Sequence, residues 1–156
     1  NKGNIFFKRA LSPNIAADFE KRKVEMKNFQ EVSKNFTNNK IFIEGAGGLY
    51  VPLNDDKTMI DLISFFNLPV ILVCRTKLGT INHSLLSIAL LNQKNIQLHG
   101  LVFNGKYEPQ TMDTIEKLGS KIYKKKINIL AHIPQQKIIN VEVVNKMKGL
   151  FKENEI

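Results

Sequence analysis

Short, continuously apolar runs recur along this chain with helical segments between them, and this alternation limits the fold more than any other feature. Four runs have this character, at residues 40–44, 69–74, 98–103 and 127–133. Unbroken apolar strands are typical of parallel sheets that are covered on both faces. Helices between such strands supply the crossovers that parallel pairing requires. The pattern therefore predicts an α/β fold built on a parallel sheet.

The starts of the intervening helices are marked by capping signals. Ser12 followed by Pro13 predicts a helix with proline at its first position. Thr58 and Asp61 have the spacing of a capping box, which predicts a helix to about Phe66. Further helices are expected at 80–91, 109–122 and 141–151. No convincing strand precedes Ser12, so we expect the first strand of the sheet to be absent from this chain.

Length and composition favour one globular domain, predicted to span residues 1–156. The longest apolar stretches are about seven residues, against the roughly 20 needed to cross a bilayer. The start of the chain has no signal-peptide pattern. The one cysteine, Cys74, lies inside a predicted strand and is interpreted as a core residue rather than a nucleophile. These features predict a cytoplasmic protein without a membrane partner.

The net charge of +9 comes from 23 Lys and Arg against 14 Asp and Glu. Such a balance is compatible with nucleic acid, an anionic membrane or acidic small ligands. The densest basic run, residues 121–126, falls at the end of a predicted helix. We interpret it as a solvated helix end rather than a nucleic-acid patch.

The strongest chemical signal is a predicted strand that ends in Glu44 and is followed by Gly45, Ala46, Gly47 and Gly48. The carboxyl end of a parallel strand faces the ligand crevice of such folds. A carboxylate there can hold Mg²⁺ beside a polyphosphate, and the glycines let backbone N–H groups approach a ligand closely. A tight turn with an exposed glutamate is the alternative.

Several motifs follow one another in a characteristic order. They are EGAGGLYVPL at 44–53, Asp61, PVILV at 69–73, LGTINH at 78–83, GLVFNG at 100–105 and HIP at 132–134. The ordered set resembles the dethiobiotin synthetase family over nearly the whole chain. The EGAGG loop alone is shared with related amidotransferases and cobyrinate synthases, whereas LGTINH is more specific. The resemblance implies a P-loop NTPase-like layer sandwich.

The resemblance also implies an activity. Family members are homodimeric cyclo-ligases of biotin biosynthesis that use ATP with Mg²⁺, diaminononanoate and CO₂. Glu44 is then the metal ligand, and none of the residues of this chain is assigned as catalytic. Residues implied in nucleotide binding are Glu44, Gly45, Ala46, Gly47, Asn104, Gly105, Pro134 and Gln135. Those implied in substrate binding are Ser12, Pro13, Gly47, Gly48, Gly79, Thr80, Ile81 and Asn82.

Some of these roles have ordinary structural alternatives. The segment from Gly79 to Asn82 opens a predicted helix, whose free N–H groups suit a substrate carboxylate, but Thr80 as a simple N-cap is the alternative. His83 is interpreted as a helix-surface or interface residue. At position 14 the family usually has histidine, whereas this chain has Asn14, so no contact is assigned to it.

The largest departure from the family is the lack of a G-x-x-x-x-G-K-S/T motif. We therefore expect that roughly the first third of the family's enzyme is missing and that this chain alone is inactive. The alternative to a synthetase is a non-catalytic nucleotide-binding or partner-binding relative. A third hypothesis is a nucleic-acid-associated ATPase, which is supported only by the net charge of +9.

Overall fold

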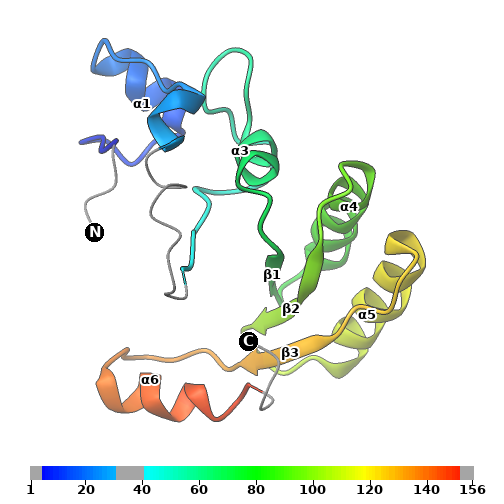
Figure 1. Ribbon diagram of the computed structural model, residues 1–156. Helices are drawn as coiled ribbons and strands as arrows, with labels where there is room; N and C mark the ends of the chain where they lie inside the picture. The colour runs from blue at the N-terminus through cyan, green and yellow to red at the C-terminus, as the bar shows by residue number, and fades with distance from the viewer. Residues whose placement is uncertain (1–4, 31–40, 152–156) are drawn as a thin grey trace. The chain divides into compact units, whose positions relative to one another are not determined.

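The computed structural model describes residues 5–30 and 41–151 (Figure 1). It divides into two compact units, Asn1–Asn67 and Leu68–Ile156, and each is described by itself. The second unit contains a parallel sheet with flanking helices, which confirms the predicted α/β class. The prediction of a single domain over 1–156 stays a prediction.

Among the described residues, the sheet of the second unit has three parallel strands in the order β1-β2-β3. They are β1 Val70–Arg75, β2 Leu98–Asn104 and β3 Ile129–Ile133. Helix α4 Thr80–Gln93 connects β1 to β2, α5 Pro109–Tyr123 connects β2 to β3, and α6 Val141–Lys148 follows β3. Three of the four predicted strands and the helices between them are thus confirmed.

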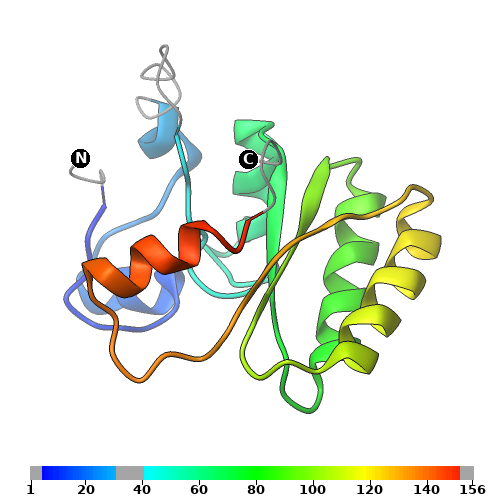
Figure 2. The same cartoon turned by 90° about the horizontal axis from the view of Figure 1, so that it is seen from below.

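Helices α4 and α5 lie side by side against the sheet (Figures 1 and 2). Gly119 allows their close approach, since a Cβ there would lie 2.8 Å from Cδ1 of Ile88. An apolar cluster in the second unit contains the buried residues Val102, Leu130 and Ala131, with Phe151 packed against them. Leu101 and Phe103 are fully buried and, by strand alternation, belong to the opposite face from Val102. The central strand is therefore covered on both faces.

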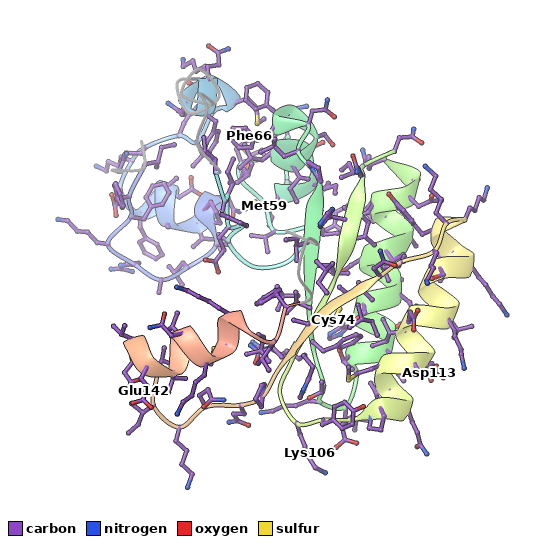
Figure 3. All side chains as sticks on the ribbon, turned by 60° about the horizontal axis from the view of Figure 1, so that its bottom comes forward. Met59, Phe66, Cys74, Lys106, Asp113 and Glu142 are labelled. Atoms are coloured by element: carbon purple, nitrogen blue, oxygen red, sulfur yellow. The ribbon has the colours of Figure 1, made fainter. Side chains whose placement is uncertain are left out.

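In its described residues, the first unit contains the helix α1 Pro13–Phe19, the 3₁₀ helix η1 Met26–Phe29 and the helix α3 Met59–Phe66. Its core contains Ala17, Val24, Leu53, Met59 and Leu62. Met59 and Phe66, both from α3, are labelled in Figure 3. Phe66 lies edge-on to Phe29, with ring centroids 6.4 Å apart. This core fixes α3 and the segment that precedes it.

The predicted strand at 40–44 is the main correction. Position 40 lies outside the described residues, and residues 41–45 have no regular secondary structure. Phe42 is 72% exposed. A strand exists only through hydrogen bonds to a neighbour, and the three-stranded sheet pairs without this segment. The expected burial of β1 on both faces is likewise wrong for Val73, which is 60% exposed.

The helix signals predict starts better than ends. The capping box of α3 is confirmed, because Oδ2 of Asp61 accepts from the Thr58 N–H at 2.8 Å and from the Thr58 hydroxyl at 3.0 Å. Pro13 opens α1 as predicted, but Ser12 makes no capping bond and donates to Oδ1 of Asn14 instead. Helix α6 stops at Lys148, three residues short of the predicted end.

Candidate nucleotide and substrate site

Three of the predicted site segments leave the same edge of the sheet. Arg75 at the end of β1 is in register with Asn104 at the end of β2, and Asn104 is in register with Ile133 at the end of β3. Residues 79–82, 104–105 and 134–135 follow directly from these ends. In open α/β sheets, ligands bind outside the carboxyl ends of the strands. The structure therefore gathers these predicted residues at the expected edge.

Asn104 and Gly105 form a turn that is held on several sides. The Asn104 side chain is exposed, while the Gly105 N–H donates to the Ile133 carbonyl at 3.0 Å. Gly105 has φ +137°, a conformation that favours glycine, and a Cβ there would collide with Oγ1 of Thr76. Glycine is required at this position, and the turn presents the Asn104 amide outward.

Sequence reasoning missed His132 and Tyr107 as neighbours of this turn. Nε2 of His132 lies 2.9 Å from the Gly105 carbonyl, and the Tyr107 ring packs edge-on to the His132 ring at 5.3 Å. His132 was part of a recognised motif but had no assigned role. In the sequence, a role for His132 was indicated only by its place two residues before Pro134 and Gln135, which were predicted to bind the nucleotide.

The start of α4 differs in detail from the predicted N-cap. Gly79 is the capping residue, with φ +90°, and Thr80 donates its hydroxyl to the Arg75 carbonyl at 2.5 Å. The alternative in which Thr80 caps the helix is therefore wrong. In the described part of the chain, the N–H groups of Ile81 and Asn82 make no backbone hydrogen bond. Both residues are exposed, as a carboxylate site at this helix end requires.

Cys74 is a core residue, as interpreted from the sequence. Its side chain is buried, and burial raises the pKa of the thiol, with a smaller opposing effect from a hydrogen bond to Ser84. A nucleophilic cysteine requires the opposite change, a lowered pKa. The basic run 121–126 lies at an exposed helix end, as interpreted, because α5 ends at Tyr123 and Lys124, Lys125 and Lys126 are exposed. That this run binds no nucleic acid stays a prediction.

The glycine loop lies in the first unit and is exposed throughout. Gly47 has φ +81°, and a Cβ there would lie 2.9 Å from Cγ2 of Val51. The first N–H groups of α3 hold the segment after the loop: Met59 donates to the Val51 carbonyl at 2.9 Å and Ile60 to the Leu49 carbonyl at 2.8 Å. These N–H groups are thus used for anchoring the loop and are not available to a phosphate.

Glu44 precedes this loop as an exposed carboxylate. Among residues 5–30 and 41–151, no group of three or more His, Cys, Asp or Glu side chains could hold a metal ion. Mg²⁺ is commonly bound through one or two carboxylates, with phosphate oxygens and water completing its octahedron. One exposed carboxylate fits that mode of binding and does not fit a site made entirely from protein ligands.

The start of α1 lies beside the segment that follows the glycine loop. The Asn14 N–H donates to the Pro52 carbonyl at 3.4 Å, and the Asn14 side chain accepts from the Ser12 hydroxyl at 2.8 Å. Asn14, which departs from the family pattern, is therefore engaged locally. Ser12 and Pro13 share the first unit with the loop 44–48, whereas the strand-end segments belong to the second unit.

The fold and the arrangement of these segments define a class of protein. A parallel sheet with crossover helices and polar segments at its carboxyl edge is typical of nucleotide-binding α/β proteins. The family model described as an AAA domain matches residues 3–143. In the described residues, no helix is long and apolar enough to cross a membrane.

Comparison with individual proteins narrows this class. The ATP-dependent dethiobiotin synthetase BioD of Lawsonia intracellularis is 37% identical over 145 residues, which is 93% of this chain and 70% of the relative. The protein of the same name from Christiangramia forsetii is 38% identical over 98% of this chain and 72% of the relative. The Fusobacterium nucleatum protein is 48% identical over 62% of this chain and 46% of its own length. The chain belongs to the dethiobiotin synthetase family.

Proposed function

We propose that this chain acts as an ATP-dependent dethiobiotin synthetase, a cyclo-ligase of biotin biosynthesis that works in the cytoplasm. The reaction joins diaminononanoate and CO₂: a carbamate forms on one amine, ATP phosphorylates it, and the second amine displaces phosphate to close the ureido ring. The names of the relatives support the reaction class. The structural observation that supports this proposal is the register of Arg75, Asn104 and Ile133, which brings three predicted site segments to one edge of the sheet.

The nucleobase is proposed to bind at the Asn104–Gly105 turn and along Pro134 and Gln135. An asparagine amide carries a donor and an acceptor, so it can pair with both the amino group and a ring nitrogen of adenine. In the described part of the chain, no hydrogen bond engages the Asn104 side chain, which is exposed at the end of β2. Its amide is therefore available to a ligand.

The phosphate side is proposed to involve the loop in the first unit. Glu44 would hold Mg²⁺, which when bound supplies charge neutralisation for the polyphosphate. The exposed backbone of Gly45, Ala46 and Gly47 can approach phosphate oxygens without side-chain obstruction. Positioning and charge stabilisation account for most of phosphoryl-transfer catalysis.

The start of α4 is proposed to take the carboxylate of the substrate. The N–H groups of Ile81 and Asn82, together with the helix dipole, attract an anion at this end. Gly48, Ser12 and Pro13 are proposed to line the substrate in the first unit. In the family, the carboxylate belongs to substrate held mainly by the neighbouring subunit, so we propose a two-fold homodimer.

The test is formation of dethiobiotin and phosphate from ATP, Mg²⁺, bicarbonate and diaminononanoate by a purified preparation in which this chain is accompanied by a P-loop segment, in one longer polypeptide or as a second chain. We expect equal amounts of both products, and omission of diaminononanoate should abolish phosphate release. ATP binding without thermal stabilisation by diaminononanoate would instead support the non-catalytic alternative. The expectation that residues 1–156 alone are inactive stays a prediction, and the same assay tests it.

A further inference from the structure

We propose that His132 is a positioning residue that fixes the Asn104–Gly105 turn and thereby sets the preference for the nucleobase. The inference rests on the proposed function, because it assigns a role at the nucleobase end of the proposed ATP site. It adds His132, a residue of β3 that does not itself contact the base, to the residues that determine nucleotide selectivity.

The first argument is the hydrogen bond from His132. In β3, His132 is in register with Phe103 of β2, so its ring reaches past the end of the neighbouring strand. Nε2 lies 2.9 Å from the Gly105 carbonyl oxygen. A carbonyl only accepts, so Nε2 must carry the proton and donate. The imidazole ring is half-buried, so this hydrogen bond is stronger than one that is fully exposed to water.

The second argument is that β3 holds both peptide groups next to Gly105. The N–H of Gly105 belongs to the peptide that joins it to Asn104, and it donates to the Ile133 carbonyl at 3.0 Å. The carbonyl of Gly105 belongs to the following peptide and accepts from His132. Without the second bond, only one of the two peptide planes is held, and glycine has no Cβ to restrict the other.

The third argument is that Gly105 has a backbone conformation that is rare for other residues. Gly105 has φ +137°, and Thr76 lies against its Cα so closely that a Cβ would collide with Oγ1. A residue in such a conformation persists when its surroundings determine it from several sides. Thr76, just after β1, and His132 of β3 both approach Gly105 and restrain the turn that carries the Asn104 side chain.

Tyr107 supports the His132 ring from the loop that follows the turn. Its ring packs edge-on against His132, with centroids 5.3 Å apart and planes at 62°. Tyr107 itself is 63% exposed, and the part of its ring that is covered contacts the His132 ring. An ion pair of 2.9 Å between Lys106 and Glu108 spans the tyrosine, and Figure 3 shows Lys106 in this loop. Tyr107 therefore restricts the orientation of the ring.

The test compares ATP with ITP, which differ in the group at position 6 of the purine. Replacing His132 with Leu keeps a side chain of similar size but removes the donor, whereas His132→Gln restores an N–H at about the distance of Nε2. In the intact protein, we expect His132→Leu to raise the KM for ATP about tenfold with kcat within about twofold, as expected for loss of one positioning bond. The preference for ATP over ITP should fall, and His132→Gln should recover most of it.

Two further variants separate positioning from loss of folding. Tyr107→Leu alters an exposed residue and should shift ATP selectivity in the same direction by a smaller factor. His99→Leu changes a histidine at the opposite end of the same sheet and should leave ATP selectivity unchanged. An unchanged selectivity in His132→Leu, an equal fall in kcat and rise in KM, or failure of His132→Gln to recover selectivity would each overturn the inference.

Direct binding distinguishes this inference from the proposed function. Displacement of a fluorescent ATP analogue by ATP and ITP measures selectivity without ring closure. A fall in ATP preference in His132→Leu supports the inference even where no dethiobiotin forms. Dethiobiotin formation with unchanged nucleotide selectivity in His132→Leu overturns the inference and leaves the proposed function standing.

Discussion

Substitution of two adjacent glycines in the loop 44–48 should have opposite effects on stability. Gly47 has φ +81°, and a Cβ there would lie 2.9 Å from Cγ2 of Val51. Gly48 has no positive φ, and a Cβ there meets nothing within 4 Å. Gly47→Ala and Gly48→Ala therefore add the same methyl group in two different backbone environments.

The magnitude follows from these environments. An alanine at a left-handed φ costs about 1–2 kcal/mol, and the contact with Val51 adds to that cost because a β-branched side chain has few alternative rotamers. At a compatible φ, Gly→Ala stabilises by about 0.4–1 kcal/mol through the unfolded state. The two variants should therefore differ by about 2 kcal/mol in free energy of unfolding, which corresponds to roughly 4–8 °C for a chain of this size.

Thermal and urea unfolding of the two purified variants, side by side with the parent, measure this difference. Gly47→Ala should have a midpoint below that of the parent, and Gly48→Ala a midpoint above it. The m-value should be unchanged, since neither substitution alters the surface exposed on unfolding appreciably. Equal midpoints for the two variants would refute the argument from backbone conformation.

Four other predictions follow from the site. In an intact enzyme, Glu44→Gln should lower turnover by orders of magnitude with little effect on the unfolding midpoint, and near-parental activity at limiting Mg²⁺ would remove Glu44 from the site. Asn104→Ala should raise the KM for ATP more than it lowers kcat, and equal effects on ATP and CTP would indicate a structural role. Sedimentation should show a dimer, and a fully active monomer would refute the shared carboxylate site at 79–82. Because burial raises the pKa of the Cys74 thiol, iodoacetamide at pH 8 should react more slowly with the folded than with the unfolded protein, and equal rates would contradict a core position for Cys74.

The sequence by itself determined the local elements and the family. The capping box of Thr58 and Asp61 involves groups three residues apart, so their spacing alone sets the start of α3. Unbroken apolar runs likewise predicted β1, β2 and β3. The central strand β2 is buried on both faces, as that pattern suggests, whereas β1 has the pattern although Val73 is exposed. The run at 41–44 has the same pattern but no strand in the described residues, since pairing depends on a neighbour and not on the pattern.

The tertiary structure decided which of these residues meet. Register between strands places Asn104 beside Ile133 and brings His132 to the Gly105 carbonyl, although 27 residues separate the histidine from the glycine. The direction of the Thr80 hydroxyl, toward the Arg75 carbonyl, also follows from how the turn after β1 closes. Such contacts depend on strand pairing and on the path of the backbone through a turn. Neither is specified by the spacing of residues along the chain, so the positioning of the proposed nucleobase site became visible only in three dimensions.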